Sequence, residues 1–333
     1  SNIAVTCTTN TYTLGGTVSG LGTGKSLVLS NGTVTLTANA NAAFTFASAI
    51  PSGTAFNITV STQPVGQTCS VTNGSGTIAA AAVTNVVVAC STNSYTVSGT
   101  INGLLGSGLV LQNNSSNDQT PAAGATSFAF PAVAGNSPYV VAVASQPVNP
   151  SQTCSVVNGS GTGTGGNVTN VTVNCVINSF PVNVTVSGLT GSGLVLRNNG
   201  GNNLSVSANG TSTFSTQLLS GNSYNVTVFA QPTSPTQVCT PSGATGTVGN
   251  GPVTVTIACS TQSYTVGGTI SGLAGTGLQI RNNGGDTQTI AANATTFSFP
   301  TQVASGGAYA VTVLTQPSSP VQSCTVANGS GTV

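Results

Sequence analysis

The feature that most constrains this chain is an internal repeat of about 84 residues. Three landmarks recur with that period: an aromatic residue, a Gly-Leu pair and a Gln-Pro pair. The Gln-Pro pairs begin at Gln63, Gln146, Gln231 and Gln316. A fixed period of this length indicates several small structural units rather than one large domain. We therefore expect a leading segment of residues 1–10 and four repeats, at residues 11–92, 93–177, 178–261 and 262–333.

Apolar and polar residues alternate inside each repeat, and this period of two predicts half-buried β-strands. In the fourth repeat the expected strands are residues 264–271, 278–281, 287–291, 296–299, 309–314 and 323–327. A seventh strand is expected in the second and third repeats, at residues 168–175 and 253–259. Short strands with frequent turn signals and no helical periodicity predict an all-β fold. We expect four tandem immunoglobulin-like, seven-stranded β-sandwich repeats.

Charged residues are so few that they exclude most kinds of chemistry. The chain contains no His and no Glu, and its charged side chains are Lys25, Arg197, Arg281, Asp118 and Asp286. General acid–base catalysis needs a group that titrates near the working pH, usually a His or a carboxylate with a partner nearby. The two Asp residues are far apart in the sequence, each in a polar loop. We therefore expect no catalytic residues and no enzyme activity.

The same composition argues against several kinds of partner. Three cations cannot form the basic patch that a phosphate backbone requires, so we expect no nucleic-acid binding. Two carboxylates cannot build a calcium site in each repeat, so we expect no metal and no other cofactor. No apolar run approaches the ~20 residues that span a bilayer. The net charge of +1 removes the usual electrostatic barrier to association between copies.

The cysteines carry the strongest signal in the sequence. Six of the eight form pairs that are 20 or 21 residues apart: Cys69 with Cys90, Cys154 with Cys175, and Cys239 with Cys259. Each pair would join the sixth expected strand to the seventh, which closes a loop worth roughly 3 kcal/mol in the chain-entropy model. A tetrahedral zinc site is the alternative, but the chain has no CxxC pair and no His. Disulfides of this regularity indicate an oxidising compartment, at the cell surface or outside it.

Two cysteines remain, and they lie in complementary contexts. Cys7 ends a segment with Ile3 and Val5 that matches the seventh strand of a repeat. Cys324 lies in the sixth expected strand of the fourth repeat, for which residues 1–333 offer no seventh strand. We expect Ile3, Val5 and Cys7 to act as a donor strand in the fourth repeat of a neighbouring copy, with an intermolecular disulfide between Cys7 and Cys324.

A competing interpretation is that the sequence is an excerpt of a longer tandem array. If residue 333 ran directly into another residue 1, Cys324 and the next Cys7 would be 16 residues apart rather than 20 or 21. About four or five residues of turn would then be missing, and this spacing favours donation between separate chains.

The repeated segments carry a resemblance to a known group of proteins. They are residues 264–273 with the Gly-Leu turn, residues 277–285, the Phe-x-Phe pair, the Gln-Pro pair and the Cys-x-Val-x-Asn-Gly-Ser-Gly segment. Together they resemble the tandem Ig-like repeats of large bacterial surface and secreted proteins. The first strand and the Gly-Leu turn are also similar to prealbumin-like B-type modules of collagen adhesins. Those modules often carry Lys–Asn isopeptide bonds assisted by an acidic residue. Here only Lys25 is available and Glu is absent, so that cross-link is not expected.

The resemblance implies a surface location and a stalk or fibre role. Our main hypothesis is the structural subunit of an extracellular bacterial filament, whose partners are copies of itself joined head to tail. Such assembly is similar in mechanism to the strand exchange of chaperone-assembled pili, although no pilin motif is present. The alternative is a segment of an adhesin stalk that presents or contributes a glycan- or surface-binding function. Ice binding through Thr-rich faces belongs to this second class, but the Thr spacing does not favour it. The isolated cations Lys25, Arg197 and Arg281 are expected to be solvated charges at strand edges.

Overall fold

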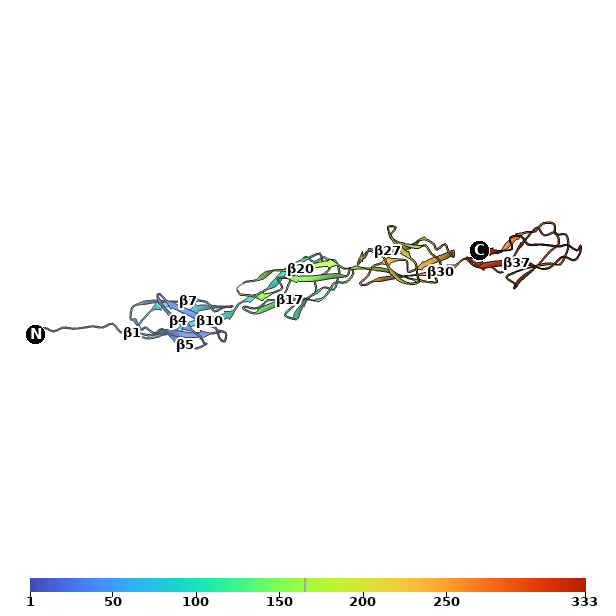
Figure 1. Ribbon diagram of the computed structural model, residues 1–333. Helices are drawn as coiled ribbons and strands as arrows, with labels where there is room; N and C mark the ends of the chain where they lie inside the picture. Colours follow the sequence, from blue (N-terminus) through green and yellow to red (C-terminus); the bar gives the residue numbers. More distant parts are fainter. Residues whose placement is uncertain (165) are drawn as a thin grey trace. The chain divides into compact units, whose positions relative to one another are not determined.

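The computed structural model describes residues 1–164 and 166–333, and in that part of the chain the regular elements are all β-strands. It divides into two compact units, residues 1–148 with 152–176, and residues 149–151 with 177–333. Each unit contains two of the sequence repeats (Figure 1). No helix in the described residues is long and apolar enough to cross a membrane. The expected all-β class with tandem β-sandwich repeats is confirmed.

The first repeat consists of two four-stranded sheets and one short ribbon. One sheet contains the two cysteine strands, and we call it the cysteine sheet; its order is β5-β2-β10-β8. The second sheet has the order β4-β3-β7-β9, and β1 pairs with β6. The bounds of these strands are β1 (Thr11–Tyr12), β2 (Leu14–Ser19), β3 (Leu27–Asn31), β4 (Val34–Ala38), β5 (Ala43–Thr45), β6 (Ile50–Pro51), β7 (Ala55–Thr62), β8 (Gln67–Thr72), β9 (Ser75–Thr77) and β10 (Val83–Thr92).

The second repeat has the same arrangement, with a cysteine sheet of order β15-β12-β20-β18 and a second sheet of order β14-β13-β17-β19. The ribbon is formed by β11 and β16. The strands are β11 (Ser94–Tyr95), β12 (Val97–Asn102), β13 (Val110–Asn113), β14 (Ser116–Gln119), β15 (Ser127–Ala129), β16 (Val133–Ala134), β17 (Pro138–Ser145), β18 (Gln152–Val157), β19 (Ser160–Thr162) and β20 (Val168–Ile177).

In the third repeat the cysteine sheet has the order β25-β22-β30-β28, and the second sheet has the order β24-β23-β27-β29. The strands β21 and β26 form its ribbon. The bounds are β21 (Ser179–Phe180), β22 (Val182–Ser187), β23 (Leu194–Asn198), β24 (Asn202–Val206), β25 (Gly210–Thr213), β26 (Leu218–Leu219), β27 (Ser223–Ala230), β28 (Gln237–Ser242), β29 (Thr245–Thr247) and β30 (Val253–Thr261).

The fourth repeat keeps the second sheet and loses half of the cysteine sheet. Its second sheet has the order β34-β33-β37-β38, whereas the other side contains only the pair β32 and β35, and β31 pairs with β36. The strands are β31 (Ser263–Tyr264), β32 (Gly267–Thr269), β33 (Leu278–Asn282), β34 (Asp286–Ile290), β35 (Thr296–Ser298), β36 (Val303–Ala304), β37 (Ala308–Thr315) and β38 (Ser330–Thr332).

The side-chain pattern explains why each repeat folds as a sandwich. Buried Val, Leu, Ile and Phe residues from the facing sides of both sheets form a separate core in every repeat, while Thr, Ser and Asn occupy the alternate, outward positions. In the first repeat, for example, Leu29 and Val88 have no exposed surface. The proline after each Gln ends the strand before it, because proline cannot donate to a β-ladder. Accordingly β37 stops at Thr315, just before Gln316 and Pro317.

The structure corrects two details of the expected strands. The Asn-Gly-Ser-Gly segment has the composition of a turn and is not among the expected strands, but Ser75–Thr77 forms β9. Each complete repeat therefore has an eighth sheet strand beyond the seven expected. Gly76 lies directly under the ring of Phe56, and a Cβ at Gly76 would be 2.9 Å from that ring. An aromatic ring that covers a strand glycine stabilises such an edge. The second correction concerns residues 323–327, which do not form a strand.

Candidate functional site

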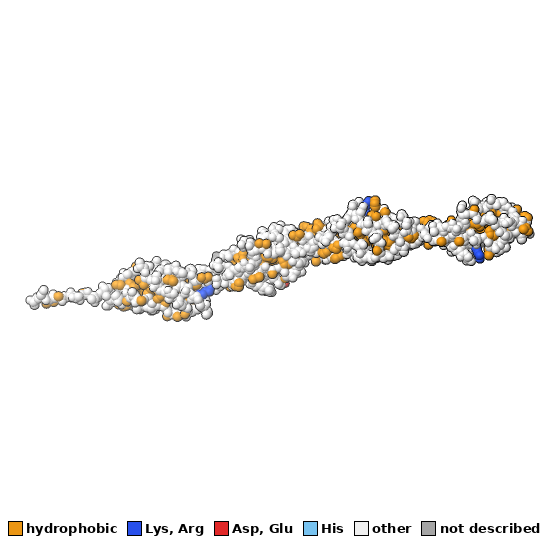
Figure 2. Space-filling model, viewed as in Figure 1, with side chains coloured by type: hydrophobic (Ala, Val, Ile, Leu, Met, Phe, Trp, Pro, Cys, Tyr) orange, Lys and Arg blue, Asp and Glu red, His pale blue; other side chains and the backbone are white. Residues whose placement is uncertain are grey.

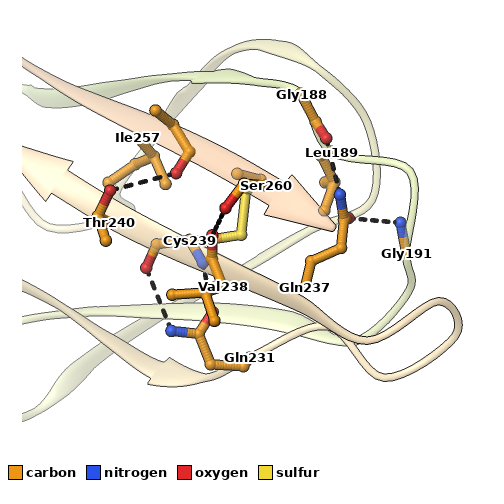
Figure 3. Close-up of a disulfide and its surroundings, with 12 residues drawn as sticks. Gly188, Leu189, Gly191, Gln231, Gln237, Val238, Cys239, Thr240, Ile257 and Ser260 are labelled. Atoms are coloured by element: carbon orange, nitrogen blue, oxygen red, sulfur yellow. Dashed lines mark hydrogen bonds between the residues drawn. A yellow bond between two sulfur atoms is a disulfide. The ribbon is translucent and has the colours of Figure 1, made fainter. Parts of the chain in front are cut away.

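The third repeat shows how a complete cysteine sheet is closed. Its last strand, β30, lies in the middle of the sheet, parallel to β22 on one side and antiparallel to β28 on the other. The side chains of Val255 and Ile257 point into the core and have no exposed surface. Cys259 stands opposite Cys239 of β28, and the two are joined by a disulfide (Figure 3). One strand therefore supplies two core residues, one disulfide partner and two ladders of backbone hydrogen bonds.

Disulfides occupy the same position in the first two repeats, where Cys69 is bonded to Cys90 and Cys154 to Cys175. These three intrachain pairs are the ones that the cysteine spacing predicts. Each cysteine pair joins the strand in the middle of the cysteine sheet to the strand at its edge.

Two glutamines hold the edge strand β28 in place, as Figure 3 shows. The Gln237 side chain is 1% exposed, and its Oε1 accepts hydrogen bonds from the backbone N–H groups of Thr190 (2.8 Å) and Gly191 (2.7 Å). Its Nε2 donates to the carbonyl of Gly188 at 2.8 Å. The Gln231 side chain pairs with both backbone groups of Cys239, at 2.8 and 3.1 Å. Buried polar groups that are fully paired in this way define one geometry for the edge.

The fourth repeat retains both glutamines although its middle strand is not among the described residues. Gln322 accepts from the N–H groups of Ala274 (2.8 Å) and Gly275 (2.7 Å). It also donates to the carbonyl of Gly272 at 2.7 Å. Gln316 pairs with the backbone of Cys324 at 2.7 and 3.0 Å, so residues 322–324 follow the path of the corresponding part of β28. The edge is positioned without the strand that normally pairs with it.

Between β32 and residues 322–327 lies the position that β30 occupies in the third repeat, and we call this gap the open site. A Cβ at Gly20 would lie 2.1 Å from the carbonyl oxygen of Cys90, and one at Gly188 would lie 2.2 Å from that of Cys259. At the equivalent Gly272, nothing described lies within 4 Å. In the open site, the space beside Gly272 is therefore unfilled by any described residue, whereas in the first and third repeats it holds the carbonyl of the middle-strand cysteine.

The core beside the open site is also less covered than in the complete repeats. Ile270 is half-buried, whereas the equivalent Val18 and Val186 are 4% and 2% exposed. Cys324 is half-buried and unbonded, whereas Cys239 is 2% exposed. Because a strand needs a ladder partner for its N–H and C=O groups, the missing strand explains why residues 323–327 are irregular. It also explains why β32 is only half as long as β22.

At the other end of the chain, residues 1–10 form no strand and extend away from β1 (Figure 1). Ile3 and Val5 are both 84% exposed, and Cys7 is exposed and unbonded. Residues 3–9 match residues 255–261 of β30 in pattern, so that Ile3, Val5 and Cys7 take the positions of Val255, Ile257 and Cys259. We call residues 3–9 the donor segment. Its apolar side chains have the spacing of core residues but contact no core within the described chain.

Cys7 and Cys324 are both unbonded in the structure. The expected intermolecular disulfide and the donor role of Ile3 and Val5 remain predictions. The two glutamines beside each edge cysteine were missed as functional residues. The sequence does carry a signal for one of the two, because a Gln lies two positions before each edge cysteine. These residues are Gln67, Gln152, Gln237 and Gln322.

The isolated charges lie on the surface and are held by local contacts. Lys25 donates to the carbonyl of Val65. Arg197 donates to Asn203 at 2.8 Å, and its guanidinium lies 3.5 Å from the centroid of the Phe229 ring. Arg281 donates to Thr312 at 3.3 Å. Figure 2 shows that the visible face is mostly uncharged polar and scattered apolar side chains, with isolated cations. No patch of like charge gathers on that face.

Comparisons with known proteins assign the chain to no family. No protein-family model matches the chain, and no curated protein matches it. Among solved structures, the Bacillus anthracis TIE protein aligns with a TM-score of 0.44 and 14% identity, over 92% of this chain and 63% of that chain. The pilus adhesin SpaC from Lactobacillus rhamnosus GG aligns with a TM-score of 0.21 and 11% identity, over 75% of this chain and 43% of that chain. This chain therefore spans less than two thirds of the length of each, and we draw no functional inference from these alignments.

Proposed function

We propose that this protein is an extracellular structural protein whose copies join head to tail, the donor segment of one copy filling the open site of the next. The observation that carries the proposal is the match between the two sites. The open site lacks two core side chains and a disulfide partner, and the exposed donor segment offers Ile3, Val5 and Cys7 at the required spacing.

The third repeat supplies the register of the proposed contact. There Ile257 pairs with Val186 of β22 and with Pro241 of β28, and Cys259 pairs with Cys239. Transferred to the fourth repeat, these pairs put Val5 between Ile270 and Val326, and Cys7 opposite Cys324. The donor segment then runs parallel to β32 and antiparallel to residues 322–327. Its sulfur meets the Cys324 sulfur at the place where every complete repeat has a disulfide.

The energetics favour occupation of the open site. Full burial of Ile3 and Val5 contributes about 1.5–3 kcal/mol for each side chain. Both edges of the open site also gain backbone hydrogen bonds, in the manner of strand addition to a sheet. The glutamine contacts of Gln316 and Gln322 pre-organise the edge, which lowers the conformational entropy lost on binding. The disulfide then makes the contact covalent.

The geometry of the contact determines the kind of assembly. The donor surface and the acceptor surface are different parts of the chain, so the interface is heterologous and each added copy presents a new open site. Such contacts generate open chains of copies. The three internal disulfides support assembly in an oxidising compartment, and hence a location at the cell surface or outside the cell. The scarcity of titratable groups supports a mechanical role without enzyme activity.

The proposal is tested by complementation between two single-cysteine variants of the full chain. Cys7→Ser retains a functional acceptor, and Cys324→Ser retains a functional donor. Under oxidising conditions we expect the unmodified protein to form a ladder of disulfide-linked multimers on a non-reducing gel, which collapses to monomer on reduction. Either variant alone should give only monomer, and an equimolar mixture should give a single dimer band.

The mixture also separates the proposal from its main alternative. If the open site is filled by a further stretch of a longer chain, as in an adhesin stalk, the two variants have no reason to join. Joining by the donor segment would be ruled out if both samples, the mixture of variants and the unmodified protein, stayed monomeric.

A further inference from the structure

A single linker residue connects the first repeat to the second. The backbone N–H of Asn93 donates to the carbonyl of Gly66 in the first repeat, at 2.9 Å. Its carbonyl accepts from the N–H of Gly135 in the second repeat, at 2.7 Å. Asn93 thus bridges a turn of one repeat to a turn of the next through its backbone, and its side-chain Oδ1 accepts from the Thr68 hydroxyl of the first repeat at 2.9 Å.

The third and fourth repeats meet through an equivalent linker. The N–H of Gln262 donates to the carbonyl of Thr236 at 3.0 Å, and the N–H of Ser305 donates to the carbonyl of Gln262 at 2.7 Å. A third hydrogen bond closes this junction, because the N–H of Thr236 donates to the Ser305 hydroxyl at 3.1 Å. The same three positions therefore meet in both units.

Half of such a junction is already formed at the start of the first repeat. Asn10 holds the linker position, and its carbonyl accepts from the N–H of Ser52 at 2.9 Å, as Gln262 accepts from Ser305. Ser52, like Ser305, carries a hydroxyl, and it is exposed where Ser305 is half-buried. The backbone N–H of Asn10 donates to no described residue.

The other half lies at the end of the fourth repeat. Val321 holds the position of Gly66 and Thr236, in a turn where Ser318 bridges to Val321 as Thr233 bridges to Thr236. Gly66 is buried and Thr236 is half-buried, but Val321 is 85% exposed. Its turn has the backbone arrangement of a junction without the neighbouring repeat.

We propose that Val321 of one copy docks between Asn10 and Ser52 of the next copy, so that the contact between copies reproduces the junction between repeats. The inference rests on the proposed donor-segment assembly, because residues 3–9 lead directly into Asn10. The N–H of Asn10 donates to the carbonyl of Val321, and the N–H of Val321 donates to the Ser52 hydroxyl. This second contact fixes the orientation of one copy relative to the next. With the donor segment alone, that orientation would depend on the backbone conformation of residues 9–11.

The test is amide hydrogen exchange at single-residue resolution, in joined and in separate copies of the full chain. Filling of the open site protects the amides of the edge strand. In the third repeat the pairing with β30 ends at Gln237, whose equivalent is Gln322. Val321 therefore lies outside this ladder, and its protection reports on the junction alone. We expect the Val321 amide to exchange about tenfold more slowly in joined copies, the effect of one added hydrogen bond. The substitution Ser52→Ala should remove that protection and leave the disulfide ladder intact.

Three controls make the result specific. Asn10→Pro removes the N–H donor and should weaken Val321 protection, whereas Asn10→Ala keeps the N–H and should not. Ser305→Ala should release the Thr236 amide inside each chain, which shows that loss of one serine hydroxyl is detectable. A ladder that forms with no change in Val321 exchange would overturn the docking inference alone. Absence of the ladder would overturn both the docking and the donor-segment assembly.

Discussion

The third and fourth repeats contain the same landmark residues, yet only the third has a closed cysteine sheet. Gln231 and Gln237 have their counterparts in Gln316 and Gln322, which bond to equivalent partners. Gln237 donates to the Gly188 carbonyl at 2.8 Å, and Gln322 donates to the Gly272 carbonyl at 2.7 Å. What differs is the presence of β30, whose Val255 and Ile257 fill the core. Local contacts therefore position the edge, and one strand that is distant in sequence decides whether the sheet closes.

This difference teaches that the open site is pre-formed rather than unfolded. The second sheet of the fourth repeat keeps the four-strand order of the other repeats, and Phe299 remains 1% exposed. Only the residues that would pair with the missing strand lose regular structure. We therefore expect the proposed incoming strand to bind with little rearrangement of the site.

The largest expected effect comes from a charge placed on the donor segment. Val5→Asp would bury a carboxylate in the core of the next copy, and an unpaired buried charge is strongly unfavourable. We expect the disulfide ladder to be lost. Thr6→Asp is the matched control, because the equivalent Ala258 of β30 is exposed. It adds the same charge on the outward face and should leave the ladder intact. Equal loss with both variants would contradict the assigned register.

A smaller effect is expected from removal of one internal disulfide. The double substitution Cys239→Ala with Cys259→Ala opens a loop whose closure is worth roughly 3 kcal/mol in the chain-entropy model. Hydrogen exchange in β30 and β28 should accelerate accordingly, by about a hundredfold. The comparison variant carries the double substitution Cys7→Ser with Cys324→Ser. In copies that are not joined, hydrogen exchange in its fourth repeat should equal that of the unmodified protein. A comparable acceleration there would mean that the two terminal cysteines are bonded within one chain.

The smallest effect separates the two edge glutamines. Gln237→Ala leaves the N–H groups of Thr190 and Gly191 without partners in a buried setting, which costs about 1–3 kcal/mol. Gln322→Ala should cost the separate chain less, because water reaches the half-buried site. It should nevertheless slow ladder formation, because the edge is no longer pre-organised. Thermal unfolding and the rate of disulfide joining measure the two effects. An equal loss of stability in both variants would show that the fourth repeat is closed in solution.

Much of the fold followed from the sequence because strand alternation and cysteine spacing are local or regular signals. The period of two located β37 within one residue, at Ala308–Thr315. The strand β9 was missed because Ser75, Gly76 and Thr77 have turn composition, and its pairing depends on Phe56 above Gly76. Residues 323–327 have strand alternation but no ladder partner in the part of the chain that the structure describes, so a strand was expected there and none formed.

The candidate site was predictable in part. The unmatched cysteines and the apolar residues beside Cys7 identified the donor segment and its proposed acceptor. The glutamine contacts were not foreseen, because a side chain that bridges Gly188 to Gly191 depends on tertiary placement. The proposed junction uses backbone groups of Asn10 and Val321, which leave no signature in residue type, and Ser52 contributes a hydroxyl that many other serines of the chain also carry.

The most direct test of the central claim is a disulfide map of mixed, isotopically labelled copies. Trypsin cuts after Lys25, Arg197 and Arg281, which puts Cys7 in peptide 1–25 and Cys324 in peptide 282–333, each the one cysteine of its peptide. Equal amounts of labelled and unlabelled protein are joined, digested and weighed by mass spectrometry. The account predicts a disulfide-linked pair of these peptides, with mixed-label pairs as abundant as matched-label pairs. Matched-label pairs alone would place both cysteines in one chain, and two unlinked peptides from joined material would contradict the account.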